Sequence, residues 1–237
     1  MNLVLLAAGR GSRLPAIYRN SPKCLVDVNN KPIIEHNLKF FNLFKKKIII
    51  TGYKNQKLKT FIEKNNFTEI YNDQYQKTNM TYSFFKSEIH VDDEVVLCYG
   101  DIIFNYKLFN LLKKKENLIP VYSNWYNLWK KRMKIQDILN DAESLEIEKD
   151  YIISIGEKIK VLPKYQYMGI VKLTLKDFKV LKKFFFNECS MKMDMTSFIN
   201  FAIQKKIIKF KATKYSNYWY EIDNSDDIKL ANKEITW

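Results

Sequence analysis

The sequence is poor in the residues that usually carry metal or disulfide chemistry. Its 237 residues include three cysteines and two histidines. Cys24, Cys98 and Cys189 are far apart and lack the short spacings of zinc ligands, so neither a disulfide framework nor a zinc site is indicated. His36 and His90 have no partner at a catalytic spacing, and we assign them no role. The chemistry of this chain must therefore come from other side chains.

A long apolar run is also missing. Residues 3–8 are apolar, but the run stops at Gly9 and is followed at once by a basic segment. It is too short for a signal peptide or a membrane span, and no other segment is longer. We therefore expect a cytoplasmic protein without a membrane partner. Internal repeats and low-complexity tracts are absent as well.

Positive charge, in contrast, is in excess. Forty Lys and Arg against 26 Asp and Glu give a net charge of +14, which favours anionic partners such as nucleic acid or phosphorylated small molecules. The basic runs at 45–47, 113–115 and 130–132 are scattered, so we interpret most of them as solvated surface and expect no nucleic-acid partner. A basic nucleic-acid-binding module remains the alternative of another class.

Strand and helix patterns alternate through the first half. Short apolar runs predict strands at 3–8, 47–51, 69–71, 94–99 and 118–122. Helical spacing predicts helices at 32–43, 56–65 and 106–115, and a helix beginning at Thr78 or Asn79. The alternation predicts an α/β fold with a largely parallel, doubly wound sheet and a site at the carboxyl ends of its strands.

The second half is less regular. Strands are expected at 152–155, 159–162, 168–173 and 207–212, and helices at 175–186, at 196–204 and after Asn224 or Ser225. With 46% hydrophobic residues, the chain can build one sizeable core. We interpret residues 1–237 as a single domain, in which 1–122 bind a nucleotide and 123–237 form an acceptor-binding half and lid.

The most specific segment directly follows the first expected strand. Residues 6–14 read Leu-Ala-Ala-Gly-Arg-Gly-Ser-Arg-Leu, and residues 22–25 read Pro-Lys-Cys-Leu. Glycines let the backbone approach a triphosphate, while backbone N–H groups, Arg13 and Lys23 supply donors and positive charge. The segment matches neither the Walker pattern nor the Gly-x-Gly-x-x-Gly of dinucleotide folds.

Together these two segments resemble the signature of nucleotidyltransferases that make nucleotide sugars and related activated metabolites. That signature is an apolar strand, Ala-Gly-x-Gly-x-Arg-Leu, and then Pro-Lys-x-Leu. The resemblance implies a Rossmann-like nucleotidyltransferase A fold, with a mostly parallel mixed sheet flanked by helices, and a Mg²⁺-dependent enzyme in which Arg13 and Lys23 are catalytic. The nucleotide-binding positions that it implies in the loop are Leu6, Ala7, Ala8, Gly9, Gly11 and Ser12.

Two acidic positions extend the resemblance along the chain. Gly100 and Asp101, at an expected strand end, look like the family's nucleotide- and metal-binding pair, and Asp223 looks like its second acidic position. The resemblance implies that both aspartates hold Mg²⁺. Each also closes an apolar run, so a parallel sheet can bring them to one carboxyl edge. Taken alone, Asp223 is as easily explained as the start of the last helix.

The segment 72–83 suggests the nucleotide donor. It is similar to the cytidylyltransferase branch, including phosphocholine and aminoethylphosphonate cytidylyltransferases, which carries an Asn-x-x-x-Ser element matched here by Asn79 and Ser83. The resemblance implies CTP as donor and these two residues as nucleotide contacts. Asn79 is also an acceptable helix cap. Sugar-1-phosphate uridylyl- or thymidylyltransferases of the same fold remain the alternative.

Aromatic residues of the second half suggest an acceptor pocket. We expect Trp129, Tyr167, Trp219 and Glu221 to contact the acceptor, although core packing is the commoner use of aromatics. The cations at 130–132 argue against choline and for an acceptor with an amide or carboxylate. The resemblance implies a small phosphate- or phosphonate-bearing acceptor of the phosphoglutamine, phosphocholine or aminoethylphosphonate type.

Overall fold

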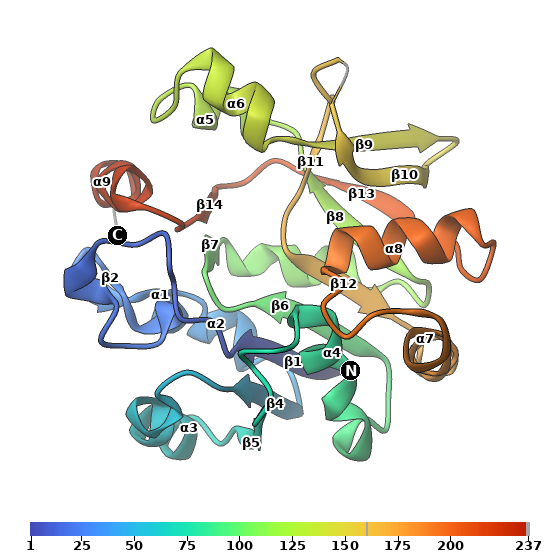
Figure 1. Cartoon of the computed structure of the whole chain (residues 1–237), viewed down its shortest axis with the longest axis horizontal. Coiled ribbons are helices and arrows are strands. Elements are labelled where there is room, and N and C mark those ends of the chain that lie inside the picture. Colours follow the sequence, from blue (N-terminus) through green and yellow to red (C-terminus); the bar gives the residue numbers. More distant parts are fainter. Residues whose placement is uncertain (160, 236–237) are drawn as a thin grey trace.

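Ten strands form one sheet in the computed structural model, which describes residues 1–159 and 161–235 (Figure 1). The strand order is β5-β4-β1-β6-β12-β8-β13-β10-β9, and β11 pairs with β8. The strands are β1 (Asn2–Ala7), β4 (Lys46–Thr51), β5 (Thr68–Tyr71), β6 (Val95–Tyr99), β8 (Leu118–Tyr122), β9 (Glu143–Glu148), β10 (Tyr151–Lys158), β11 (Gln166–Tyr167), β12 (Ile170–Leu173) and β13 (Lys211–Tyr215).

The sheet is mixed but mostly parallel in the part that carries the glycine-rich segment. β1 pairs in parallel with β4 on one side and with β6 on the other, and β4 pairs in parallel with β5. β12 then runs antiparallel to β6 and β8, whereas β8 and β13 are parallel. The carboxyl ends of β1, β4 and β6 therefore lie along one edge. The predicted Rossmann-like architecture is confirmed.

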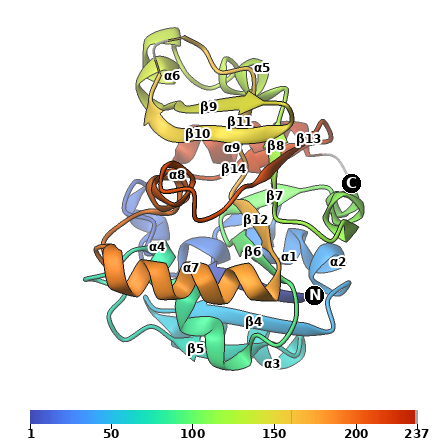
Figure 2. The ribbon, with the colours of Figure 1, turned by 90° about the vertical axis from the view of Figure 1, so that its right-hand side faces the viewer.

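Helices cover both faces of this sheet (Figures 1 and 2). Alternate residues of β1 point to opposite sides, as the pleat of a strand requires. Leu3 and Leu5 pack in the core with the first helices, whereas Val4 packs in the core with the phenylalanines of α4, α7 and α8. The helices are α1 (Ile33–His36), α2 (Leu38–Phe41), α3 (Lys59–Lys64), α4 (Met80–Phe85), α5 (Trp125–Trp129), α6 (Ile135–Asp141), α7 (Leu175–Glu188), α8 (Met195–Gln204) and α9 (Ser225–Glu234).

Short elements complete the fold. Two small sheets lie outside the main one: β2 (Asp27–Val28) with β3 (Lys31–Pro32), and β7 (Ile102–Phe104) with β14 (Trp219–Glu221). The 3₁₀ helices are η1 (Ala16–Tyr18), η2 (Lys23–Leu25), η3 (Asn55–Leu58), η4 (Lys86–His90) and η5 (Tyr106–Lys113). None of the helices in the described part of the chain has the length and apolarity that crossing a bilayer would need.

Three predicted helices differ from those observed, and the one expected at 56–65 begins as the 3₁₀ helix η3 before it continues as α3. The helix expected at 32–43 is divided into α1 and α2 at Asn37, whose buried amide donates to the Ile102 carbonyl at 2.6 Å and accepts from the Phe104 amide at 3.2 Å. The Asn37 side chain thus pairs with backbone groups of β7 in the way a neighbouring strand would. The segment predicted as a helix at 106–115 is the 3₁₀ helix η5.

The second half departs further from the sequence-based expectation. β9 and the helices α5 and α6 were not predicted, and the strand expected at 207–212 begins only at Lys211. Residues 159, 161 and 162 of the strand expected at 159–162 are not in a strand, and residue 160 lies outside the described residues. These elements form the upper part of the molecule in Figure 1, joined to the main sheet through β8, β13 and β10.

Candidate functional site

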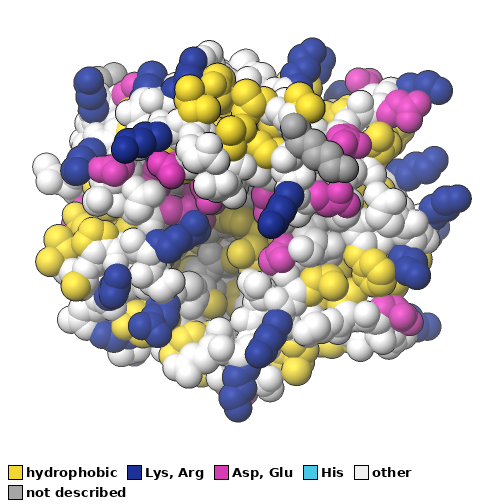
Figure 3. Space-filling model, turned by 45° about the horizontal axis from the view of Figure 1, so that its top comes forward, with side chains coloured by type: hydrophobic (Ala, Val, Ile, Leu, Met, Phe, Trp, Pro, Cys, Tyr) yellow, Lys and Arg dark blue, Asp and Glu magenta, His cyan; other side chains and the backbone are white. Residues whose placement is uncertain are grey.

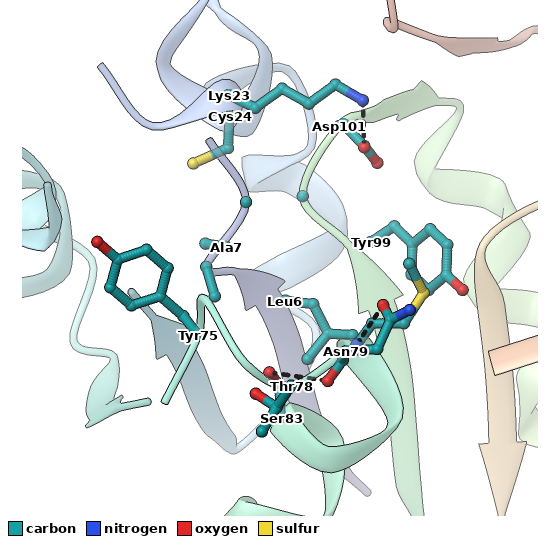
Figure 4. A pocket seen from close by; sticks show the side chains of 14 residues that line it. Leu6, Ala7, Lys23, Cys24, Tyr75, Thr78, Asn79, Ser83, Tyr99 and Asp101 are labelled. Carbon is teal, nitrogen blue, oxygen red and sulfur yellow. Dashed lines mark hydrogen bonds and ion pairs between the residues drawn. The ribbon is translucent and has the colours of Figure 1, made fainter. Parts of the chain in front are cut away.

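A cavity of about 200 Å³ opens where β1 and β6 end. The molecular surface is hollowed near the middle of the face shown in Figure 3, and both acidic and basic side chains border the hollow. The cavity is built by the segments after β1 and β6, by η2 and by the start of α4 (Figure 4). Its lining residues are Leu6, Ala7, Ala8, Gly9, Lys23, Cys24, Tyr75, Thr78, Asn79, Met80, Ser83, Tyr99, Gly100 and Asp101.

The loop after β1 turns back so that Lys23 reaches the cavity. Gly11 has a φ of +63°, which glycine adopts without strain, and a Cβ there would lie 2.7 Å from Leu14 Cδ1 and 3.3 Å from Lys23 Cβ. The Lys23 amide donates to the Gly9 carbonyl at 3.2 Å. Gly9 lines the cavity, whereas Gly11 and the exposed Ser12 shape the loop beside it.

Lys23 joins the two predicted metal-binding aspartates. Its Nζ lies 2.6 Å from Asp101 Oδ2 and 2.5 Å from Asp223 Oδ1, and the three side chains are 13%, 23% and 11% exposed. Arg13 reaches the same Asp223 oxygen from the loop, with its guanidinium nitrogen at 2.8 Å. Four residues from three distant parts of the sequence therefore meet at one end of the cavity.

Asp223 arrives by a route that differs from the predicted one. We expected it to close a strand of the main parallel sheet, but β14 pairs antiparallel with β7 in a separate two-stranded ribbon. Asp101 immediately precedes β7, and the Ile222 amide donates to the Asp101 carbonyl at 3.0 Å. Asp227 Oδ2 accepts from the Asp223 amide at 2.8 Å, which fixes the turn into α9. The two carboxylates thus meet through a local ribbon.

The charges of this cluster are strongly coupled. Burial opposes the charged form of Lys23, but Asp101, Asp223 and Glu221 outweigh it and raise the pKa of the ammonium above its usual value. Burial, together with the nearby Asp223 and Asp101 carboxylates, raises the pKa of Glu221 well above its usual value. The two aspartates therefore hold the Lys23 ammonium in its charged form.

Asp101 and Asp223 fit a magnesium ion whose other ligands are phosphate and water oxygens. No group of three or more His, Cys, Asp and Glu side chains within 1–159 and 161–235 could hold a metal alone. Asp101 and Asp223 nevertheless converge on one cation, and Asp101 Oδ1 is buried without a hydrogen-bond partner among the described residues. Mg²⁺ commonly uses one or two carboxylates with phosphate and water oxygens, and this donor set matches that habit.

Gly100 fits closely against the end of β1. Its amide donates to the Leu6 carbonyl at 2.9 Å, and a Cβ at this position would lie 2.5 Å from that carbonyl oxygen. Because the obstacle is backbone, the contact cannot be relieved by turning a side chain. The close fit brings Asp101 next to the glycine-rich loop.

Gly100→Ala should destabilise the fold by about 1–3 kcal/mol through this clash. For a chain of this size, each kcal/mol corresponds to roughly 2–4 °C in Tm, which thermal denaturation would detect. Gly9→Ala is the matched control, since nothing lies within 4 Å of a Cβ there. An unchanged Tm for Gly100→Ala would contradict the proposed fit.

Ser83 and Asn79 lie at the other end of the cavity, at the start of α4 (Figure 4). Asn79 caps this helix, because its Oδ1 accepts from the Met80 amide at 2.7 Å, and its Nδ2 donates to the Lys192 carbonyl at 3.2 Å. Its side chain is thus engaged within the protein. Ser83 is buried and its hydroxyl receives a hydrogen bond from Asn72 Nδ2 at 2.9 Å.

The expected acceptor residues do not line this cavity. Trp219 is 1% exposed and donates from Nε1 to the Met168 carbonyl at 3.1 Å. Trp129 and Tyr167 are also buried; Trp129 packs edge-to-face on Trp125, and Tyr167 packs edge-to-face on Tyr99. Packing in the core is the visible use of these three rings.

Sequence reasoning did not single out five of the lining residues: Cys24, Tyr75, Thr78, Met80 and Tyr99. Cys24 and Tyr99 belong to the two motifs that were recognised: Cys24 directly follows Lys23 in η2, and Tyr99 directly precedes Gly100 at the end of β6. Burial raises the pKa of Cys24 to about 12, so its thiol stays neutral. The two residues therefore shape the cavity wall.

Comparisons with known proteins agree with this geometry. A family model described as a MobA-like NTP transferase domain matches residues 3–122. The CTP:phosphoglutamine cytidylyltransferase of Campylobacter jejuni is 31% identical over 97% of this chain and 98% of its own length. The choline-phosphate cytidylyltransferase of Streptococcus pneumoniae is 30% identical over 61% of this chain and 66% of its own length.

The fold has close structural counterparts as well. The inositol-1-phosphate CTP transferase from T. maritima superposes with a TM-score of 0.76, covering 98% of this chain and 95% of the other, at 18% sequence identity. At this identity, the likeness bears on the fold.

Proposed function

Since the chain belongs to the MobA-like NTP transferase family, we propose that it transfers CMP from CTP to a small phosphate- or phosphonate-bearing acceptor and releases pyrophosphate. The chain is a nucleotidyltransferase, and what we propose beyond that is the identity of its nucleotide donor and of its acceptor. The observation that carries the proposal is the cluster of Lys23, Asp101 and Asp223 at one end of a cavity bordered by the glycine-rich loop.

The reaction is an in-line substitution at the α-phosphorus of CTP. An acceptor phosphate or phosphonate oxygen forms the new P–O bond, and the bond from the α-phosphorus to the bridging oxygen breaks as pyrophosphate leaves. Because the nucleophile is already an anion, a strong general base is unnecessary. Positioning and neutralisation of negative charge must supply most of the rate enhancement.

Lys23 and Arg13 are the cations suited to this task. The Lys23 ammonium has three N–H donors, of which Asp101 and Asp223 take two, so the third remains for a phosphate oxygen. Arg13 is 64% exposed at the mouth of the site and can bind the departing pyrophosphate through its planar fork of donors. Asp101 and Asp223 would hold Mg²⁺, which would supply further neutralisation of phosphate charge.

The identity of the donor can be tested by binding. With Mg²⁺ present, CTP should raise Tm more than UTP, dTTP, ATP or GTP. The charged cluster at one end of the cavity suits the triphosphate, and Asn79 and Ser83 at the other end match the cytidylyltransferase element. Thermal-shift titrations over a common range of nucleotide concentrations would measure this preference. Equal or greater stabilisation by UTP or dTTP would remove the basis for CMP transfer.

The acceptor is assigned from similarity to relatives, because the cations at 130–132 do not discriminate between acceptors. The cations after Trp129 were expected to disfavour choline, but two of them are already paired. Arg132 lies 2.6 Å from Asp227 Oδ1, and Lys131 lies 2.5 Å from Glu234 Oε1. The full-length likeness to the phosphoglutamine enzyme supports an acceptor of that type ahead of phosphocholine and aminoethylphosphonate.

A pyrophosphate-release screen tests the whole proposal. The four nucleoside triphosphates would be combined with phosphorylated glutamine, phosphocholine, aminoethylphosphonate and sugar 1-phosphates, each with and without Mg²⁺. Release that requires CTP, an acceptor and Mg²⁺ is the expected result. Release with UTP or dTTP and a sugar 1-phosphate would instead identify a sugar nucleotidyltransferase.

A further inference from the structure

One buried amide holds the hydroxyl groups of Thr78 and Ser83. Asn72 is fully buried, and its Nδ2 donates to Thr78 Oγ1 at 3.1 Å and to Ser83 Oγ at 2.9 Å. Its Oδ1 accepts from the Gln74 amide at 3.1 Å, and this bond fixes which side of the amide faces the hydroxyls. Both N–H groups of Asn72 are therefore committed to them.

Thr78 is consequently left as a hydrogen-bond acceptor. Its hydroxyl proton is donated to the Gln74 carbonyl at 2.9 Å, and one lone pair receives the Asn72 amide. The second lone pair remains. Ser83 differs, because the only acceptor for its proton among the described residues is the Asn79 carbonyl at 3.4 Å, at the edge of hydrogen-bond range. Ser83 can redirect that proton at little cost.

These hydroxyls lie at the end of the cavity opposite the charged cluster. Figure 4 shows Thr78 and Ser83 at the foot of the cavity, and Lys23 and Asp101 at its top. Because a nucleoside triphosphate carries its phosphates at one end and its base at the other, the charged end takes the phosphates. The base then falls to the Thr78 end.

We infer that Thr78 selects cytosine over uracil, with Asn72 as the residue that positions its hydroxyl. This rests on the proposed function. Cytosine presents an amino group at C4 and an acceptor at N3, which match the lone pair of Thr78 and the mobile proton of Ser83. Uracil presents a carbonyl oxygen at C4 and a proton at N3. To donate to that oxygen, Thr78 would have to break its bond to Gln74, and otherwise two acceptors face one another.

Thr78→Val removes the hydroxyl and keeps the shape, so it tests the inference directly. It should lower the ratio of kcat/KM for CTP to kcat/KM for UTP by about tenfold to a hundredfold, the order of effect expected from one hydrogen-bonding group that discriminates between the bases. Thr78→Ser keeps the hydroxyl and should hold the ratio within about threefold of the wild type. Calorimetry should show the corresponding change in binding: the Kd for CTP should rise relative to the Kd for UTP.

Thr81→Val is the matched control, three residues further along the chain in α4. Thr81 is fully buried, does not line the cavity, and its hydroxyl has no hydrogen-bond partner among the described residues. Its replacement should leave both the CTP-to-UTP ratio and Tm unchanged or Tm slightly raised, since no bond is lost. A general packing effect at Thr78 would lower kcat/KM for CTP and for UTP by the same factor and leave their ratio unchanged.

The outcomes separate this inference from the proposed function. If the wild type uses CTP with a clear preference and Thr78→Val keeps the same ratio, the role of Thr78 is wrong while CMP transfer stands. If the wild type shows no preference for CTP over UTP, both the assignment of CTP and the inference fall. A lowered ratio in Thr78→Val, restored in Thr78→Ser, supports the inference.

Discussion

Lys23→Ala should lower turnover at saturating CTP by about a hundredfold or more, the usual cost of removing one group that stabilises transition-state charge. The reason is that Lys23 is the cation at which the two carboxylates meet, and its third N–H is available to a phosphate. Initial rates of pyrophosphate release would measure the loss. Near-normal turnover would show that the proposed role of Lys23 is wrong.

Lys23→Ala should also lower the stability of the fold, because the Lys23 ammonium offsets the charge of the carboxylates around it. Without the ammonium, Asp101 would lose its ion-pair partner and Asp223 would keep only Arg13, which destabilises the fold. We therefore expect a lower Tm without metal and a partial recovery with Mg²⁺ and CTP. Lys86→Ala is a suitable control, because Lys86 is also ion-paired, with Asp73, but does not line the cavity.

Asp101→Asn and Asp223→Asn should each lower turnover by about a hundredfold or more, because metal stabilisation of phosphate charge is worth several kcal/mol. Asparagine keeps the size of the side chain and removes its charge. The Mg²⁺ concentration for half-maximal rate should rise, which a magnesium titration of pyrophosphate release would show. Tm should change little, since Lys23 keeps one carboxylate partner in each variant.

Asp226→Asn provides the control for these substitutions. Asp226 lies three residues beyond Asp223 but is exposed and pairs with Lys229 on the surface, so its charge should not matter for turnover. If either cluster variant kept wild-type magnesium dependence, a metal shared by Asp101 and Asp223 would be ruled out. The comparison thus separates the local cluster from the net charge of the chain.

The first half of the fold was predictable because its local signals agree with one another. Buried parallel strands appear as unbroken apolar runs, and a glycine-rich loop follows the first of them. These signals place residues 6–9, Lys23 and Asp101 along one edge, where the structure also has them. Asn79 illustrates the same agreement, since the residue expected to cap a helix does cap α4.

The second half resisted prediction because its determinants are tertiary. β14 has three residues, too few for a pattern, and its place is set by pairing with β7, more than a hundred residues earlier. Aromatic residues there could be read as an acceptor wall or as core, and only burial separates the two uses. The hydrogen bond from Asn72 to Thr78 could not be predicted, because a list of residue types does not show the direction of a hydrogen bond.

The β7–β14 ribbon sets the spacing between the two aspartates of the site. Asp101 and Asp223 stand at the same end of a three-pair ladder in which Glu221 lies opposite Ile102. Their separation is therefore set by the fixed repeat of one short backbone ladder, outside the ten-stranded sheet. Loops and helices outside this ladder can therefore change in length while the two carboxylates keep their spacing.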